Sequence, residues 1–186
     1  MKIIRLFLLV LTIVSTCAVS DYTESEETSP CVSNDPLLGD SAAWAVGALN
    51  LFNEKKYSEV VEHVDSCFGI WGPEAGQKQK VMYDNRKSCP KEGRVSVIEK
   101  RKIEKNWLMN DVSTALWAKA RSLHKLDEIE LAKTSYGRCV YMSCGRTWDP
   151  QGWFWSPAKD CAKYARDLLD GYLFTQKINF FLAIQF

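Results

Sequence analysis

Apolar residues recur with helical spacing in two stretches of the chain. In residues 41–68, two apolar faces are separated by a polar turn at residues 53–56. Residues 111–140 repeat this arrangement around a polar turn at residues 127–128, and Asn110-Asp111 has the chemistry of a helix N-cap. Apolar positions three and four residues apart define one face of a helix. Each stretch therefore predicts two antiparallel helices joined by a short turn.

The two stretches match position by position at an offset of 72 residues. Ala48 and Ala120 supply a small residue at the same place in each, where antiparallel helices must approach closely. Such self-similarity indicates an internal repeat. The matched pairs are Trp44/Leu116, Ala48/Ala120, Leu51/Leu123, Tyr57/Ile129, Val60/Ala132, Val64/Tyr136 and Cys67/Cys139.

This order of large, small, large, aromatic and small residues resembles the tetratricopeptide repeat. The chain departs from that pattern at Gly47, where Leu is usual, at Val60, where Ala is usual, and at Leu116, where Trp is usual. The resemblance implies an all-α fold, in which antiparallel helical hairpins stack into a short right-handed superhelix. It also implies a concave surface that takes a peptide or a partner protein.

The region between the two stretches, residues 69–109, does not fit the repeat. Gly72-Pro73 is expected to end the preceding helix, because an internal proline removes a backbone donor. Short helices are expected at residues 77–86 and 97–108. In the second of these, the residues expected to face inward are Ile98, Ile103 and Trp107.

Residues 76–106 hold ten Lys or Arg against four acids. This excess is typical of a solvated helical face. The alternative is a patch that faces an anion, such as the acidic leader of a second copy.

Residues 145–158 form an aromatic loop. Asp149-Pro150-Gln151-Gly152 has the composition of a turn, and Ser156-Pro157 that of a helix start, so a last helix is expected from Pro157 to about Asp170, with Gly171 ending it. Either the aromatic residues cover the open end of the helical stack, or Trp148, Trp153 and Trp155 form an exposed platform for a sugar ring or a peptide. Together with Asn110-Asp111-Val112-Ser113, the run from Trp148 to Trp155 resembles the ending of uncharacterised secreted and bacterial-type repeat proteins.

The ends of the chain differ from its centre. Residues 1–20 have a basic start, an apolar run and small residues at a cleavage site after Ser20, which predicts a signal peptide and an extracellular or periplasmic location. A lipoprotein signal ending at Cys17 is the alternative. Residues 21–40 carry six acids and no base, and read as a disordered leader. The repeat-like domain is expected at residues 41–172. The apolar tail, residues 173–186, either packs on it or is an artefact of the gene model.

Six cysteines remain after residue 20, an even number that predicts three disulfides in an exported chain. They are Cys31, Cys67, Cys89, Cys139, Cys144 and Cys161. A Cys139–Cys144 bridge and a Cys144–Cys161 bridge are both feasible, and the spacing does not choose between them. We expect no metal site and no cofactor, because the chain has no Cys-x2-Cys pair and two histidines in all.

The composition and the motifs exclude several classes of function. Without residues 1–20 the net charge is −1, which argues against a general nucleic-acid binder, and no later segment is apolar for long enough to span a membrane. No hydrolase or phosphate-loop motif occurs. The sequence therefore predicts a non-enzymatic module for a protein or peptide partner. The alternative is a carbohydrate-binding or glycan-processing-associated protein that uses the tryptophan segment. On the surface that the repeat family uses, the candidate binding residues are Asn50, Asn53, Lys119 and Ser122.

Overall fold

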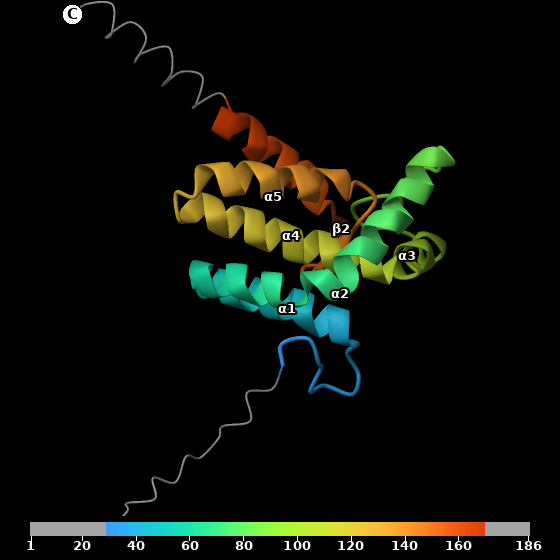
Figure 1. The fold of residues 1–186 in the computed structure, drawn as a ribbon. Coiled ribbons are helices and arrows are strands. Elements are labelled where there is room, and N and C mark those ends of the chain that lie inside the picture. Colours follow the sequence, from blue (N-terminus) through green and yellow to red (C-terminus); the bar gives the residue numbers. More distant parts are fainter. Residues whose placement is uncertain (1–28, 170–186) are drawn as a thin grey trace, which may run out of the picture.

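The computed structural model describes residues 29–169, which are mostly helical (Figure 1). The elements are α1 (Asp40–Asn53), α2 (Tyr57–Asp84), α3 (Val97–Glu104), α4 (Trp107–Lys125), α5 (Ile129–Tyr141), β1 (Thr147–Asp149) and β2 (Trp153–Trp155). A last helix covers residues 157–169. The prediction of an all-α chain is confirmed. Predictions for residues 1–28 and 170–186, the signal peptide and the apolar tail among them, lie outside the described residues.

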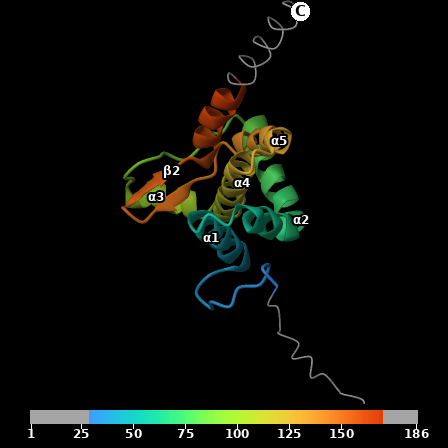
Figure 2. The ribbon, with the colours of Figure 1, turned by 90° about the vertical axis from the view of Figure 1, so that its left-hand side faces the viewer.

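Helix α4 is the centre of the structure. It packs against α1, α2 and α5, and the hairpin of β1 and β2 lies beside its first turns (Figures 1 and 2). Eleven of its 19 residues are buried. Burial of so many small and apolar side chains on one helix supplies much of the core. Ala48 and Ala120, the small residues of the repeat, are both fully buried.

The two predicted hairpins have the same turn. Helix α1 ends at Asn53 and α2 begins at Tyr57, while α4 ends at Lys125 and α5 begins at Ile129. In the first turn the N–H of Lys56 donates to the carbonyl of Leu51, and Glu128 and Leu123 make the equivalent bond in the second. These bonds satisfy carbonyl groups that a helix end leaves free. The offset of 72 residues is therefore retained in the backbone of both turns.

Helix α2 does not end at Gly72-Pro73, and that prediction is wrong. The helix continues as one element to Asp84 and includes residues 77–84 of the helix expected at residues 77–86. Buried residues on both sides of Pro73, namely Gly72, Ala75 and Gln79, hold the second half of the helix against the rest of the molecule. Tertiary packing therefore overrides the roughly 3 kcal/mol cost of an internal proline.

The boundary between α3 and α4 also differs from expectation. Residues 97–108 do not form one helix, because α3 ends at Glu104 and α4 begins at Trp107. Ile103 is buried as expected, but Ile98 and Trp107 are 70% and 56% exposed. Asn110 and Asp111 lie within α4 and do not cap it, since its N-cap is Asn106.

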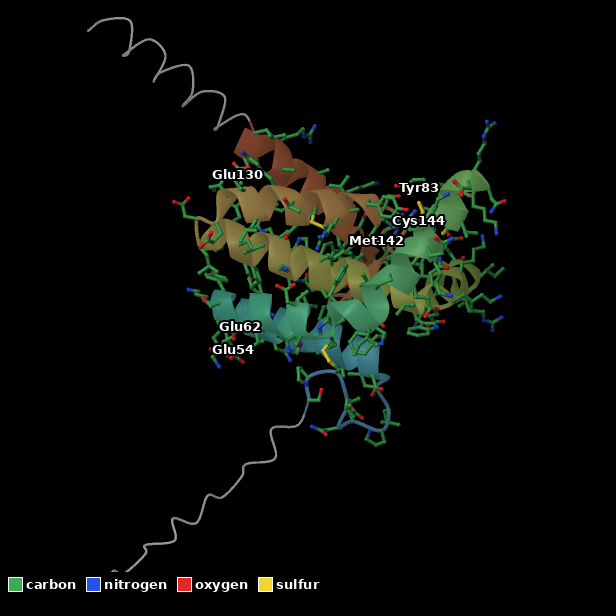
Figure 3. All side chains as sticks on the ribbon, viewed as in Figure 1. Glu54, Glu62, Tyr83, Glu130, Met142 and Cys144 are labelled. Carbon is green, nitrogen blue, oxygen red and sulfur yellow. A yellow bond between two sulfur atoms is a disulfide. The ribbon has the colours of Figure 1, made fainter. Side chains whose placement is uncertain are left out.

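Three disulfides join distant parts of the chain, as the even number of cysteines predicts (Figure 3). They are Cys31–Cys67, Cys89–Cys144 and Cys139–Cys161. Both pairings suggested by spacing are wrong. Cys139 lies near the end of α5 and meets the last helix, whereas Cys144 meets the loop that follows α2. The Cys31–Cys67 bridge ties the segment before α1 to α2.

The aromatic loop folds as predicted at its turn. The N–H of Gly152 donates to the carbonyl of Asp149 at 2.9 Å, and Gly152 has a positive φ of 105°. A glycine adopts this conformation without the strain of a side chain. The hydroxyl of Ser156 accepts a bond from the N–H of Lys159, and the last helix starts at Pro157, as expected.

The last helix is fixed to α4 and α5 by contacts of three kinds. Besides the Cys139–Cys161 disulfide, the indole N–H of Trp117 donates to a carboxylate oxygen of Asp160 at 2.6 Å. The guanidinium of Arg121 lies 3.3 Å from the ring centre of Tyr164, a cation–π contact. Within residues 29–169, no helix is long and apolar enough to cross a bilayer.

Candidate functional site

The four residues expected on the repeat surface do not share one environment. Asn50 and Asn53 are exposed near the end of α1. The ammonium of Lys119 is paired with the carboxylate of Asp65, which joins α4 to α2. Ser122 is fully buried, so it does not line a surface. Because neighbouring elements cover α4, most of its side chains pack in the core and are not accessible to a ligand.

The three candidate tryptophans belong to the hairpin and differ in exposure. Trp155 packs edge-on against Trp117, with ring centres 5.3 Å apart, and Trp153 is partly buried. Trp148 is 50% exposed, and the ammonium of Lys100 lies 5.7 Å from its ring centre. Between the two outer tryptophans of β2, Phe154 is buried. The hairpin thus covers part of α4 and leaves one indole open.

An apolar groove lies between α2 and α5. Its volume is about 540 Å³, within the range of ligand pockets. Val112 and Leu116 of α4 contribute to its lining, together with Met142, which follows α5 (Figure 3). The walls come from Phe68, Gly72 and Gly76 of α2 and from Thr134, Gly137, Arg138 and Tyr141 of α5.

Two contacts cross between α2 and α5 beside the groove. The guanidinium of Arg138 lies 5.7 Å from the ring centre of Phe68. The hydroxyl of Tyr141 donates to the carbonyl of Gly76 at 3.3 Å. These contacts fix the spacing of the two helices, so the groove is a preformed feature of the fold.

Glycines create the space in this groove. A Cβ atom placed on Gly76 or Gly137 would meet nothing within 4 Å, which means that each position opens onto free volume. At Gly72 a Cβ would lie 2.5 Å from the ring of Phe68, so glycine lets that ring lie against the helix. Glycine in a helix interior costs about 0.5–1 kcal/mol relative to alanine. The signal that sequence reasoning missed is therefore the presence of glycines inside two helical segments.

The two histidines make contacts between helices. The Nδ1 atom of His124 lies 3.0 Å from the hydroxyl of Tyr136, and burial lowers the pKa of His124 and raises that of Tyr136 to about 12. Tyr136 is fully buried. His63 and Trp44 exchange contacts with each other's backbone carbonyls, each at 2.9 Å. Both histidines therefore connect neighbouring helices.

The basic region surrounds the end of α2 and α3, where nitrogen-tipped side chains gather in Figure 3. Four of its cations have an acid close by on the same helix: Lys78–Glu74, Lys80–Asp84, Lys100–Glu104 and Lys102–Glu99. Such exposed pairs contribute little to stability, because solvent screens both charges. Arg146 lies outside this region in the sequence and, unlike these lysines, is buried: burial lowers its pKa, and its side chain donates to the carbonyls of Pro90 and Ser143.

Comparisons with protein-family models, with curated proteins and with solved structures found no match to this chain.

Proposed function

We propose that this chain is an exported, non-enzymatic interaction module, and that it binds an apolar segment of a partner protein in the groove between α2 and α5. The observation that carries the proposal is the pair of open glycine positions, Gly76 and Gly137, above an apolar lining. A partner's side chains would fill space that this chain leaves empty, and burial of each CH₂ group would contribute about 0.8 kcal/mol.

The chemistry around the groove suits a peptide more than a small polar ligand. Phe68, Val112, Leu116 and Met142 offer apolar contact, while Arg138 and Thr134 stand at the α5 side. Groove recognition in proteins commonly combines such apolar pockets with a few polar groups at the edge. The three disulfides fit a module that works outside the cytoplasm. The likeness of the two hairpins to tetratricopeptide repeats supports the same class of function.

A selection of displayed peptides on the oxidised protein tests the proposal. Peptides that bind the wild type are then measured against Gly137→Leu and Gly76→Leu, which fill the groove, and against Gly69→Leu, a matched control. Gly69 lies in α2, is exposed and has open space at its Cβ, but it does not line the groove. We expect affinity to fall at least tenfold for both groove variants and to stay unchanged for the control. Equal binding to all four proteins would overturn the proposal.

A further inference from the structure

A second cavity lies where the start of α1 meets α2 and α4, and its lining shares no residue with that of the groove. Its volume is about 400 Å³. Five of its lining residues carry chemistry: Asp40, Ser41, Trp71, Trp107 and Asp111. The lining contains two carboxylates and two indoles, and no Lys, Arg or His.

Asp111 is a largely buried acid without a cationic partner among the described residues. Its carboxylate accepts a hydrogen bond from the hydroxyl of Ser41 at 2.6 Å. Burial raises the pKa of Asp111 to about 6, and the bond from Ser41 offsets part of that effect. At neutral pH the group therefore carries a charge that neither a salt bridge nor a metal neutralises in residues 29–169. Burial of an unpaired charge is costly, which points to a positive ligand.

The carboxylate of Asp40 adds to the negative potential in the same cavity. Asp40 lies in the first turn of α1, and its Oδ1 accepts a bond from the N–H of Ser33 at 2.9 Å. No ion pair is formed by Asp40 within residues 29–169. The loop from 29 to 39, which carries the Cys31–Cys67 bridge, contains one further acid, Asp35, and no base.

The two indoles give the cavity walls that attract cations. Trp71 is supported by Trp44, with ring centres 5.0 Å apart. Trp107 is 56% exposed, although it begins the helix that forms the core. The face of an indole ring attracts a cation more strongly than that of any other side chain, and carboxylates beside it increase the attraction.

We propose that this cavity binds an alkylammonium group, held by the faces of Trp71 and Trp107 and by the carboxylates of Asp40 and Asp111. The inference does not depend on the proposed function, because the groove between α2 and α5 is formed by other residues. The ammonium group can belong to a free quaternary amine or to a lysine side chain of a partner. These sources share the same chemistry, and the test separates them.

The probe is 19F NMR of the oxidised protein labelled with 5-fluorotryptophan, which reports on each of its seven tryptophans. Choline and Nα-acetyl-lysine methylamide are titrated separately at constant ionic strength. The control ligand is 3,3-dimethylbutan-1-ol, which has the shape of choline without its charge. We expect saturable shifts of the Trp71 and Trp107 signals, a constant Trp148 signal, and no shift with the neutral alcohol. The tighter of the two ammonium ligands identifies the source.

Two variants and one control complete the experiment. Asp111→Asn keeps an acceptor for Ser41 and removes the charge, and Trp107→Ala removes an exposed ring. Each is expected to weaken binding at least tenfold. Asp127→Asn, in the distant turn between α4 and α5, changes the same net charge and is expected to leave affinity unchanged. The proposal is overturned if neither ammonium ligand gives saturable shifts, or if the neutral alcohol binds equally well.

Discussion

Lys55 and Asp127 lie 72 residues apart and adopt the same left-handed backbone conformation, with φ of 62° and 61°. Each is the residue at which a helix has ended and the chain turns back into the next one. The repeat seen in the side chains is thus also a repeat of backbone geometry. Neither residue is a glycine, although glycine adopts this conformation at least cost.

Replacing Lys55 or Asp127 by glycine is expected to stabilise the protein. The left-handed conformation costs a residue with a Cβ about 1 kcal/mol, which exceeds the entropy that glycine adds to the unfolded chain. We expect each variant to raise the free energy of unfolding by about 0.5 kcal/mol in urea denaturation. Lys56→Gly is the control, because Lys56 has a φ of −83°. This variant is not expected to raise the free energy of unfolding. A loss of stability in both turn variants would contradict this account of the turns.

Gly47 is expected to tolerate no side chain. A Cβ at this position would lie 2.8 Å from two atoms of the His63 ring. That ring is held by the carbonyl of Trp44, so it cannot move without loss of a hydrogen bond. Gly47→Ala is therefore expected to lower the free energy of unfolding by about 1–3 kcal/mol, despite the higher helix propensity of alanine. Gly47→Ala in a His63→Ala background should recover most of the loss, and failure to recover it would contradict the proposed clash.

The stability of the protein is expected to depend on the charge of Asp111. Its pKa of about 6 in the folded state lies above the value of about 3.9 in unfolded chains. The folded state therefore binds the proton more tightly, and this residue lowers stability as pH rises from about 4 through 6. At pH 7.5 Asp111→Asn is expected to be more stable than the wild type by up to about 2 kcal/mol, a difference that vanishes below pH 4. Urea denaturation at several pH values measures it, and a constant difference across this range would contradict the assignment.

The Cys139–Cys161 disulfide is expected to fix the last helix. Its loop is 22 residues long, for which the chain-entropy estimate is about 3 kcal/mol. A Cys139→Ala/Cys161→Ala variant should lose about that free energy of unfolding and expose amides of residues 157–169 to hydrogen exchange. Peptide mapping under non-reducing conditions should recover the three pairs described above. A Cys139–Cys144 or Cys144–Cys161 peptide would contradict this arrangement.

Local patterns in the sequence predicted the two hairpins, the turn at Asp149–Gly152 and the start of the last helix. Those features depend on neighbouring residues, whose apolar spacing and turn chemistry are visible in the chain. The sequence did not predict the course of α2 through Pro73, because buried contacts of Ala75 and Gln79 outweigh a local penalty. The N-cap assigned to Asn110-Asp111 failed for a related reason: α4 already begins at Trp107, and the side-chain amide of Asn110 donates to the carbonyl of Ile103.

The candidate sites depend on contacts between distant segments. Nothing near Trp71 in the sequence shows that it shares a cavity with Asp40 and Asp111, and nothing near Gly76 shows that Gly137 lies opposite. The disulfide pairing also depends on contacts between distant segments, because the spacing of cysteines along the chain does not show which of them lie close together in the fold. The expected role of Ser122 also depended on an open face of α4, which the other helices and the hairpin cover.

The groove between α2 and α5 is the central claim, and methionine methyl groups test it most directly. Met142 lines the groove, Met82 lies at the basic end of α2, and Met109 is buried in α4. A peptide selected on the oxidised protein is added to a sample labelled with 13C at the methionine methyl groups. We predict that the Met142 signal shifts in proportion to bound peptide and that the Met82 signal stays in place. A peptide that binds and leaves the Met142 signal unmoved would contradict the account.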